Sequence, residues 1–150
     1  MKSAKVVEEF LTAIENNDFT KADNFLSKDF KVVGVGPEPL GSNEYLGVHR
    51  AFNKGMPDFR FNYKITEDKG ERVFVKVRLS GTHKNTIPSP APGIKDIPAT
   101  NKSLVMPEEP VEFTVKDNRI TKMKLTPIEG GGMPGILKQL GVEMPAEVHH

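Results

Sequence analysis

Two sets of side chains alternate along residues 73–83, one set apolar and the other mostly polar. Successive side chains of a β-strand point to opposite faces, so this period of two predicts a single strand with one apolar face. That face ends in a histidine and comprises Val73, Val75, Val77, Leu79, Gly81 and His83. A titratable imidazole among apolar residues is a common feature of small-molecule sites, which makes His83 the first candidate functional residue.

The residues before this strand predict helices. Apolar residues at helical spacing indicate an amphipathic first helix, for which Ser3 is the expected N-cap, and a second short helix from Phe19. A strand over 30–35 follows, and Ser42 or Asn43 can cap a third helix. One face of that third helix carries Tyr45, Val48, His49 and Phe52.

The residues around and after the strand predict hairpins. From Phe59 the period is two, and a turn at 68–70 joins this strand to residues 73–83. Residues 111–115 and 119–125 predict a second hairpin. Between the hairpins lies a long proline-rich loop, residues 84–110, with at most one short strand near 103–106, and a short helix follows the glycines at 130–132.

This order of elements predicts the fold class. Helices followed by strands that hairpins connect indicate an α+β domain, in which helices pack on the concave face of a strongly curved, mostly antiparallel sheet and enclose a cone-shaped pocket. At 150 residues the chain is expected to form one domain, residues 1–150, with residues 142–150 as a tail. The terminal His149 and His150 are given no role, since they can be native or a tag remnant.

Composition limits the classes of partner. Lys and Arg number 21 against 20 Asp and Glu, and no block of one sign occurs, so the sequence predicts no binding to nucleic acid or to a membrane. There is no cysteine, which excludes disulfides and thiolate chemistry. No stretch approaches the roughly 20 apolar residues of a membrane span, so we expect a cytoplasmic protein.

Five short motifs, in the same order, resemble those of the SnoaL-like polyketide cyclase family, which has the nuclear transport factor 2-like, or cystatin-like cone, fold. They are Met56-Pro57-Asp58-Phe59, Gly81-Thr82-His83, Pro98-Ala99-Thr100-Asn101-Lys102, Asp117-Asn118-Arg119-Ile120 and residues 135–141. The resemblance covers nearly the whole chain. It implies a homodimer formed through the open sheet face, where Arg78 and Glu112 are expected, and a pocket for a small apolar or aromatic organic molecule.

The resemblance also implies where cyclase chemistry would be found. The cyclases place a histidine on the last strand and an aspartate some residues later, and these positions correspond here to Met123 and to Gly132 or its neighbour. Neither can move a proton. Glu129 lies close by in the sequence, and the expected acid/base pair is therefore His83 and Glu129, with no cofactor. For both residues the alternative is structural: His83 can cap a strand end, and Glu129 can be a solvated loop carboxylate.

The expected pocket is built from the apolar faces described above. Its predicted lining is Tyr45, His49, Phe52, Phe59, Phe61, Val75, Val77 and Met123. For His49, packing at the cavity rim or against a partner is favoured over a ligand contact. A metal site is not expected, because no histidine or carboxylate pair has ligand spacing.

Two functions remain open from the sequence. The first is a small-molecule-binding protein that acts as a cofactor-free isomerase or cyclase by proton transfer next to a carbonyl group. The second is a non-catalytic ligand-binding or interaction module that has lost the acid/base residues of the family.

Overall fold

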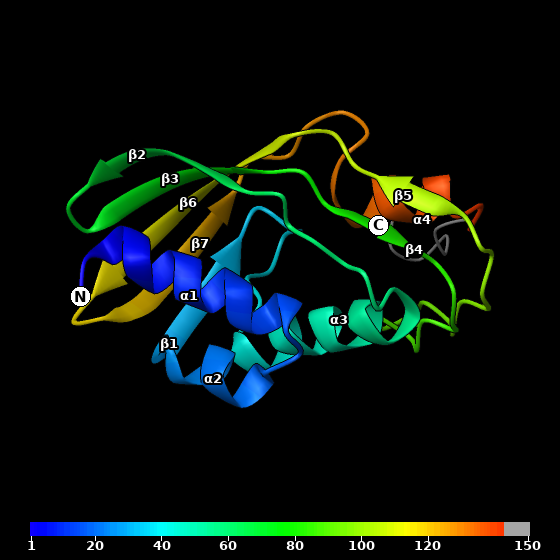
Figure 1. Cartoon of the computed structure of the whole chain (residues 1–150), viewed down its shortest axis with the longest axis horizontal. Helices are drawn as coiled ribbons and strands as arrows, with labels where there is room; N and C mark the ends of the chain where they lie inside the picture. Colours follow the sequence, from blue (N-terminus) through cyan, green and yellow to red (C-terminus); the bar gives the residue numbers. More distant parts are fainter. Residues whose placement is uncertain (143–150) are drawn as a thin grey trace.

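Four helices and seven strands form the part of the chain that the structure, a computed structural model, describes, which is residues 1–142 (Figure 1). The tail predicted at 142–150, with His149 and His150, lies outside the described residues apart from Val142. In chain order the elements are α1 (Ser3–Glu15), α2 (Phe19–Asn24), β1 (Leu26–Val33), α3 (Ser42–Gly55), β2 (Lys64–Lys69), β3 (Arg72–Val77), β4 (Ser80–Thr82), β5 (Ser103–Val105), β6 (Glu109–Lys116), β7 (Arg119–Leu125) and α4 (Gly132–Gln139). None of these helices is long and apolar enough to cross a membrane.

The main sheet has five strands in the order β1-β7-β6-β3-β2. Every neighbouring pair is antiparallel except β1 and β7, which are parallel. Helix α1 lies across one face of this sheet and contacts β2, β3, β6 and β7, while α3 contacts α2 and β1 (Figure 1). The α+β fold with a mostly antiparallel sheet and helices on one face is therefore confirmed.

The helices form where apolar residues recur every three or four positions. In α1 the residues that face the sheet are buried, among them Val6, Phe10 and Ile14. The ring of Phe10 stacks on Tyr45 of α3, with centroids 6.4 Å apart, and meets Phe113 of β6 edge-on at 6.5 Å. This aromatic contact joins both helices to the centre of the sheet.

Several predicted boundaries were wrong by a few residues, including the cap of α3, which is Gly41 rather than Ser42 or Asn43, and the start of β2, which is Lys64 rather than Phe59. Ser3 is the first residue of α1 rather than its cap, and no side chain caps that helix. The strand expected at 30–35 begins at Leu26 and ends at Val33, because Gly34 adopts a left-handed φ of 93°. The loop after it pairs back on the strand through Val32 and Leu40.

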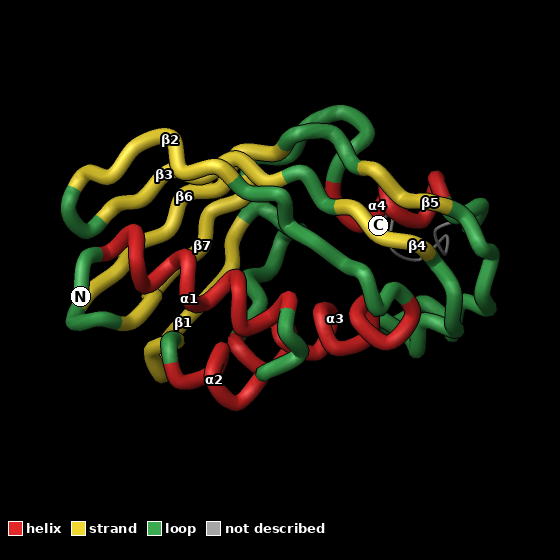
Figure 2. Tube along the Cα trace, in the orientation of Figure 1, coloured by secondary structure: helices red, strands yellow, loops and turns green. Residues whose placement is uncertain are grey.

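The single strand expected over 73–83 is the main correction to the predicted fold. It divides after Val77 into β3 of the main sheet and β4, which pairs with β5 in a separate two-stranded sheet (Figure 2). Val77 pairs with Glu109, the first residue of β6, and the pairing resumes at Ser80 with Val105 in a register shifted by one residue. Within this interruption the Met106 N–H donates to the Leu79 carbonyl at 2.8 Å, and on the other side of the strand the Arg78 N–H donates to the Phe61 carbonyl at 2.8 Å.

Asn62 fixes the position of this break. Its φ of 48° bends the chain before β2. Its side-chain amide donates to the Arg78 carbonyl and to Ser80 Oγ, both at 2.8 Å. Alternation along residues 73–83 could not reveal this, because the bend depends on a residue outside that stretch.

Residues 97–102 of the expected loop pack around His83, which is fully buried. His83 Nε2 lies 3.3 Å from the Ile97 carbonyl, and His83 Nδ1 accepts a hydrogen bond from the Thr100 N–H at 3.3 Å. A carbonyl oxygen only accepts, so the hydrogen bonds favour the tautomer with the proton on Nε2. The short strand expected near 103–106 is confirmed as β5.

Replacing His83 by alanine is expected to lower the free energy of unfolding by about 2–4 kcal/mol, because it opens a cavity and leaves the Thr100 N–H without its partner. Urea unfolding followed by circular dichroism measures the change. The exposed neighbour Lys84 provides the control, and Lys84→Ala should stay within about 0.5 kcal/mol of the natural chain. Equal stability of the two variants would contradict the structural role of His83.

Candidate functional site

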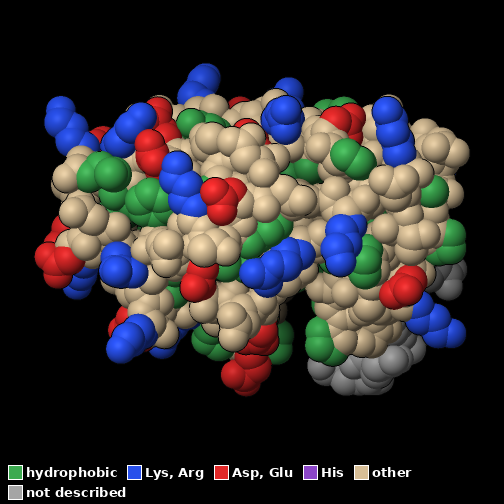
Figure 3. Space-filling model, turned by 60° about the horizontal axis from the view of Figure 1, so that its bottom comes forward, with side chains coloured by type: hydrophobic (Ala, Val, Ile, Leu, Met, Phe, Trp, Pro, Cys, Tyr) green, Lys and Arg blue, Asp and Glu red, His purple; other side chains and the backbone are tan. Residues whose placement is uncertain are grey.

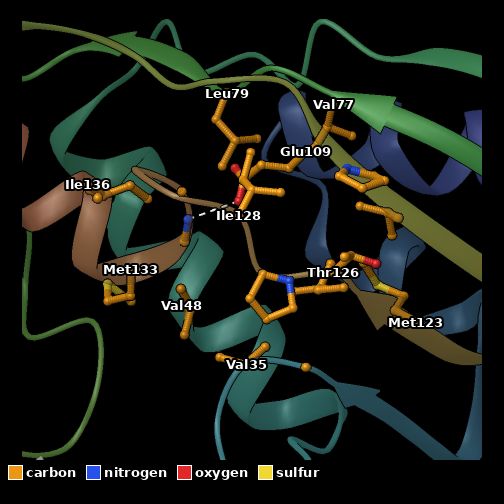
Figure 4. Close-up of a pocket in the computed structure, with 18 of the residues that line it drawn as sticks. Val35, Val48, Val77, Leu79, Glu109, Met123, Thr126, Ile128, Met133 and Ile136 are labelled. Atoms are coloured by element: carbon orange, nitrogen blue, oxygen red, sulfur yellow. Dashed lines mark hydrogen bonds between the residues drawn. The ribbon is translucent and has the colours of Figure 1, made fainter. Parts of the chain in front are cut away.

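A cavity of about 520 Å³ lies between the sheet and helices α3 and α4 (Figure 4). This is within the size range of small-molecule sites in proteins. Side chains from α3, β3, β6, β7 and the 126–138 segment enclose it, and most of them are apolar. The labelled side chains in Figure 4 include Val48 from α3, Val77 from β3, Met123 from β7, and Met133 and Ile136 from α4.

Glu109 is the one carboxylate among the lining residues, all of which lie in the described chain. It occupies the first position of β6 and shares the sheet face of Val111, Phe113 and Val115, because side chains two apart on a strand point the same way. In the antiparallel pairing with β3 it lies opposite Val77. The sheet register therefore directs this carboxyl group to an apolar wall.

The Glu109 side chain is held by the start of α4. The Gly132 N–H donates to Glu109 Oε1 at 2.9 Å, as the dashed line in Figure 4 marks. A Cβ atom on Gly131 would lie 2.6 Å from the same oxygen, so this approach requires glycine at 131. Burial raises the pKa of Glu109, and the Gly132 hydrogen bond opposes part of that rise.

Tyr45 and His49 lie one turn apart on α3, with ring centroids separated by 4.7 Å. The His49 ring also meets Phe59 at 5.5 Å and Phe61 at 5.3 Å. Burial lowers the pKa of His49 to about 4 and raises the pKa of Tyr45. Both side chains are consequently uncharged near neutral pH, and they are neutral polar residues in a mostly apolar wall.

The sequence matches the model of the SnoaL-like domain over residues 7–123. The chain belongs to the SnoaL-like family. No curated protein matches its sequence closely enough to count as a relative. The family membership confirms the resemblance drawn from the five motifs.

Solved structures with the same fold agree with this membership. IdmH of Streptomyces antibioticus, described as a candidate polyketide cyclase, has a TM-score of 0.68 at 19% identity, with 95% of this chain and 100% of that chain covered. An LEH-like epoxide hydrolase of M. tuberculosis has a TM-score of 0.60 at 22% identity, covering 93% of this chain and 92% of that one. A cystatin fold protein of Novosphingobium aromaticivorans has a TM-score of 0.61 at 11% identity, covering 85% and 99%. At these identities the similarity shows the fold.

Most side chains predicted to line the pocket of this SnoaL-like protein do line it. These are Tyr45, His49, Phe52, Phe61, Val77 and Met123. Phe59 and Val75 are instead buried in the core beside the cavity. Of the methionines, Met123 and Met133 line the cavity, whereas Met56 and Met106 are fully buried.

The structure does not bring the predicted acid/base pair together at the cavity. Neither His83 nor Glu129 is among the lining residues. Both nitrogens of His83 have partners within the 97–100 segment, and the chain that leads to it lines the cavity only as far as Leu79. Glu129 is exposed in the turn that precedes α4.

Glu109 was missed because the prediction placed residues 84–110 in a loop. The signal was present in the sequence: the alternation of Val111, Phe113 and Val115 extends back two residues to Glu109. Glu108, by contrast, falls on the other face and lies 3.8 Å from Lys76 in an exposed ion pair. No group of three His, Asp or Glu side chains in residues 1–142 is arranged to hold a metal ion.

The buried His49 predicts a pH dependence of stability. The unfolded chain takes up a proton at this histidine near pH 6.5, but the folded chain does so only near pH 4. The free energy of unfolding should therefore fall as pH decreases between these values, by about 3 kcal/mol from this group. Glu109 acts in the opposite sense, since its raised pKa favours the folded state as pH falls.

The variant His49→Leu isolates the histidine contribution. The difference in free energy of unfolding between His49→Leu and the natural chain should shift by about 3 kcal/mol in favour of the variant as pH falls from 7 to 4. The reason is that only the natural chain has to keep His49 uncharged. Urea unfolding at each pH gives this difference. Parallel pH curves for the two proteins would contradict the assignment.

Proposed function

We propose that this SnoaL-like protein binds a small, largely apolar organic molecule in its cavity and catalyses proton transfer next to a carbonyl group, without a cofactor. Glu109 is the acid/base in this proposal. The observation that carries it is the position of this carboxyl group, half-buried in a mostly apolar wall with its pKa raised by burial. A raised pKa brings a carboxyl group closer to the range in which it both takes and returns a proton efficiently.

In the proposed step the Glu109 carboxylate takes a proton from the carbon next to the carbonyl. The C–H electron pair becomes the double bond of an enolate, and the carbonyl oxygen takes up the negative charge. In a conjugated enolate, return of the proton from Glu109 to the far carbon gives an isomer. Alternatively, the enolate carbon attacks a second carbonyl of the same molecule and closes a ring, and the alkoxide that forms takes the proton back from Glu109. The Gly132 N–H orients Oε1 throughout, and Oε2 is the atom assigned to the substrate proton.

This proposal gives Glu109 the role expected of His83 and Glu129. An acid/base must reach a proton of the bound substrate. The ring of His83 is hydrogen-bonded to residues 97–100, and Glu129 is exposed outside the cavity, so neither side chain is placed to do this. Glu109 meets this requirement through its place in the wall.

A second candidate function is a non-catalytic ligand-binding module. The observation that favours it is Met123, which lines the cavity at the position where the cyclases carry a histidine. A binding protein needs only a cavity of suitable shape and one or two polar contacts, and the cavity meets that description as well.

Proton transfer is tested with 2-tetralone, a fused-ring ketone whose protons next to the carbonyl exchange slowly with D₂O. The protein should accelerate this exchange, measured by NMR, and Glu109→Gln should reduce the acceleration at least about 100-fold, because an amide does not accept the proton. Glu108→Gln is the matched control and should retain the activity, since Glu108 points away from the cavity.

The outcomes separate the two functions. Tight binding of 2-tetralone without accelerated exchange would reject the enzyme and support the binding module. Exchange that survives Glu109→Gln but disappears in His83→Gln or Glu129→Gln would return the role to the pair expected from the sequence.

The homodimer and the cytoplasmic location expected from the sequence stay predictions. The sheet face assigned to the dimer carries charged pairs such as Arg72 and Glu112, whose Nε and Oε2 atoms lie 2.8 Å apart. The surface in Figure 3 shows positive and negative side chains interspersed. A solution measurement of molecular mass would decide the oligomeric state.

A further inference from the structure

Helix α4 forms one wall of the cavity but has few polar contacts with the rest of the protein. Its residues Met133 and Ile136 line the cavity (Figure 4). Within residues 1–142, hydrogen bonds connect residues 127–142 to the preceding chain at two positions, Gly132 and Gln139. These are the first and last residues of the helix. The orientation of α4 therefore depends on what holds its two ends.

Gln139 holds the C-terminal end of α4 to strand β5, which lies beside the helix (Figure 1). The Gln139 Nε2–H donates to the Val105 carbonyl at 2.9 Å, and the Val105 N–H donates to Gln139 Oε1 at 3.3 Å. One side-chain amide thus pairs with both backbone groups of Val105, as a neighbouring strand would. Removal of this amide would leave α4 without a polar anchor at this end.

The N-terminal end of α4 is held by Glu109, four residues after Val105. The Gly132 N–H donates to Glu109 Oε1 at 2.9 Å. The three glycines at 130–132 provide no side chains that would fix the direction of the helix. From its first to its last residue α4 covers about 10 Å, and four residues of chain span at most about 14 Å. The stretch 105–109 can therefore hold both ends of the helix at once.

We propose that Gln139 is a positioning residue for Glu109. By binding Val105 it keeps α4 where the Gly132 N–H meets Glu109 Oε1, and this hydrogen bond orients the carboxyl group in the cavity wall. The inference rests on the role of Glu109 in the proposed function. It adds to that function a residue that is not among those lining the cavity.

Apolar packing holds α4 against the core but does not fix its exact position. Ile136, Leu137 and Leu140 are buried. Hydrophobic burial is non-directional, whereas a hydrogen bond requires a short distance and a nearly linear donor. A shift of α4 by about 1 Å would keep most of the burial and still break the hydrogen bond to Glu109. The hydrogen bonds of Gln139 supply the direction that apolar packing lacks.

The charged groups near Glu109 do not replace the hydrogen bond from the start of α4. Burial raises the pKa of Glu109, and this hydrogen bond lowers it. Lys138 of α4 lines the same cavity but is exposed, so water screens its charge. The ion pair of Glu108 and Lys76 lies on the other face of the sheet, and His49 is neutral near pH 7. Loss of the hydrogen bond should therefore raise the pKa of Glu109 further.

The test replaces Gln139 by methionine, which has similar length and volume but cannot donate to the Val105 carbonyl. By NMR, the exchange rate of the Gly132 amide with solvent should increase about tenfold, and the pKa of the Glu109 carboxyl group should rise. In the 2-tetralone assay, kcat should fall about tenfold with little change in KM, because Gln139 does not touch the substrate. Gln139→Ala provides the same measurements if the methionine variant does not fold.

Ser103→Ala is the matched control. Ser103 is exposed on the same strand, β5, and makes no hydrogen bond to α4 within the described residues, so both NMR measurements should stay as in the natural chain. An unchanged Gly132 amide and an unchanged Glu109 pKa in folded Gln139→Met would overturn this inference. If both change in a protein that does not accelerate the exchange of 2-tetralone, the proposed reaction is rejected and the positioning by Gln139 is supported.

Discussion

The pairing of β3 with β6 is the constraint on which the cavity and its polar groups depend. It begins at Arg72 with Thr114 and ends at Val77 with Glu109. Its register turns Val73, Val75 and Val77 toward the helices together with Phe113 and Val111, and it places the last pair at the cavity wall. The pairing is interrupted there and resumes between β4 and β5, one residue out of register. The same event therefore positions Glu109 and separates His83 from the cavity.

The helical side of the cavity is organised by aromatic contacts around uncharged polar groups. Tyr45 stacks on Phe10 of α1, and His49 lies between Tyr45 and the rings of Phe59 and Phe61. These contacts bury the tyrosine and the histidine deeply enough to keep both neutral. The two walls thus differ in kind: the helix contributes neutral hydrogen-bonding groups, and the sheet contributes an ionisable carboxyl group. In the proposed function, the carboxyl group of the sheet wall moves the proton and the neutral groups of the helix wall adjoin the ligand.

The sequence predicted what local periodicity controls. Helix α3, the hairpins and the apolar face of β3 follow from spacing alone, and so do the lining residues Tyr45, His49 and Val77. The break after Val77 did not follow, because it depends on Asn62 and on where β6 begins. Glu109 lay within reach of the same periodicity, but its neighbours Pro107 and Pro110 favoured a loop. That His49 Nδ1 lacks a hydrogen-bond partner among residues 1–142 could not be predicted from the sequence, since it depends on which rings the fold brings around it.

The position of Glu109 also bears on how this chain relates to the cyclases it resembles. Met123 occupies the position of their strand histidine and pairs with Phe113, two residues beyond Val111 on the same face as Glu109. The acid/base proposed on β6 approaches the same cavity from the strand next to β7. Any strand that lines the cavity can carry such a residue, provided that the side chain points to the cavity side of the sheet. The loss of the histidine on β7 therefore does not by itself remove the means of proton transfer, because the register of β6 brings a carboxyl group, with its pKa raised by burial, into the same space.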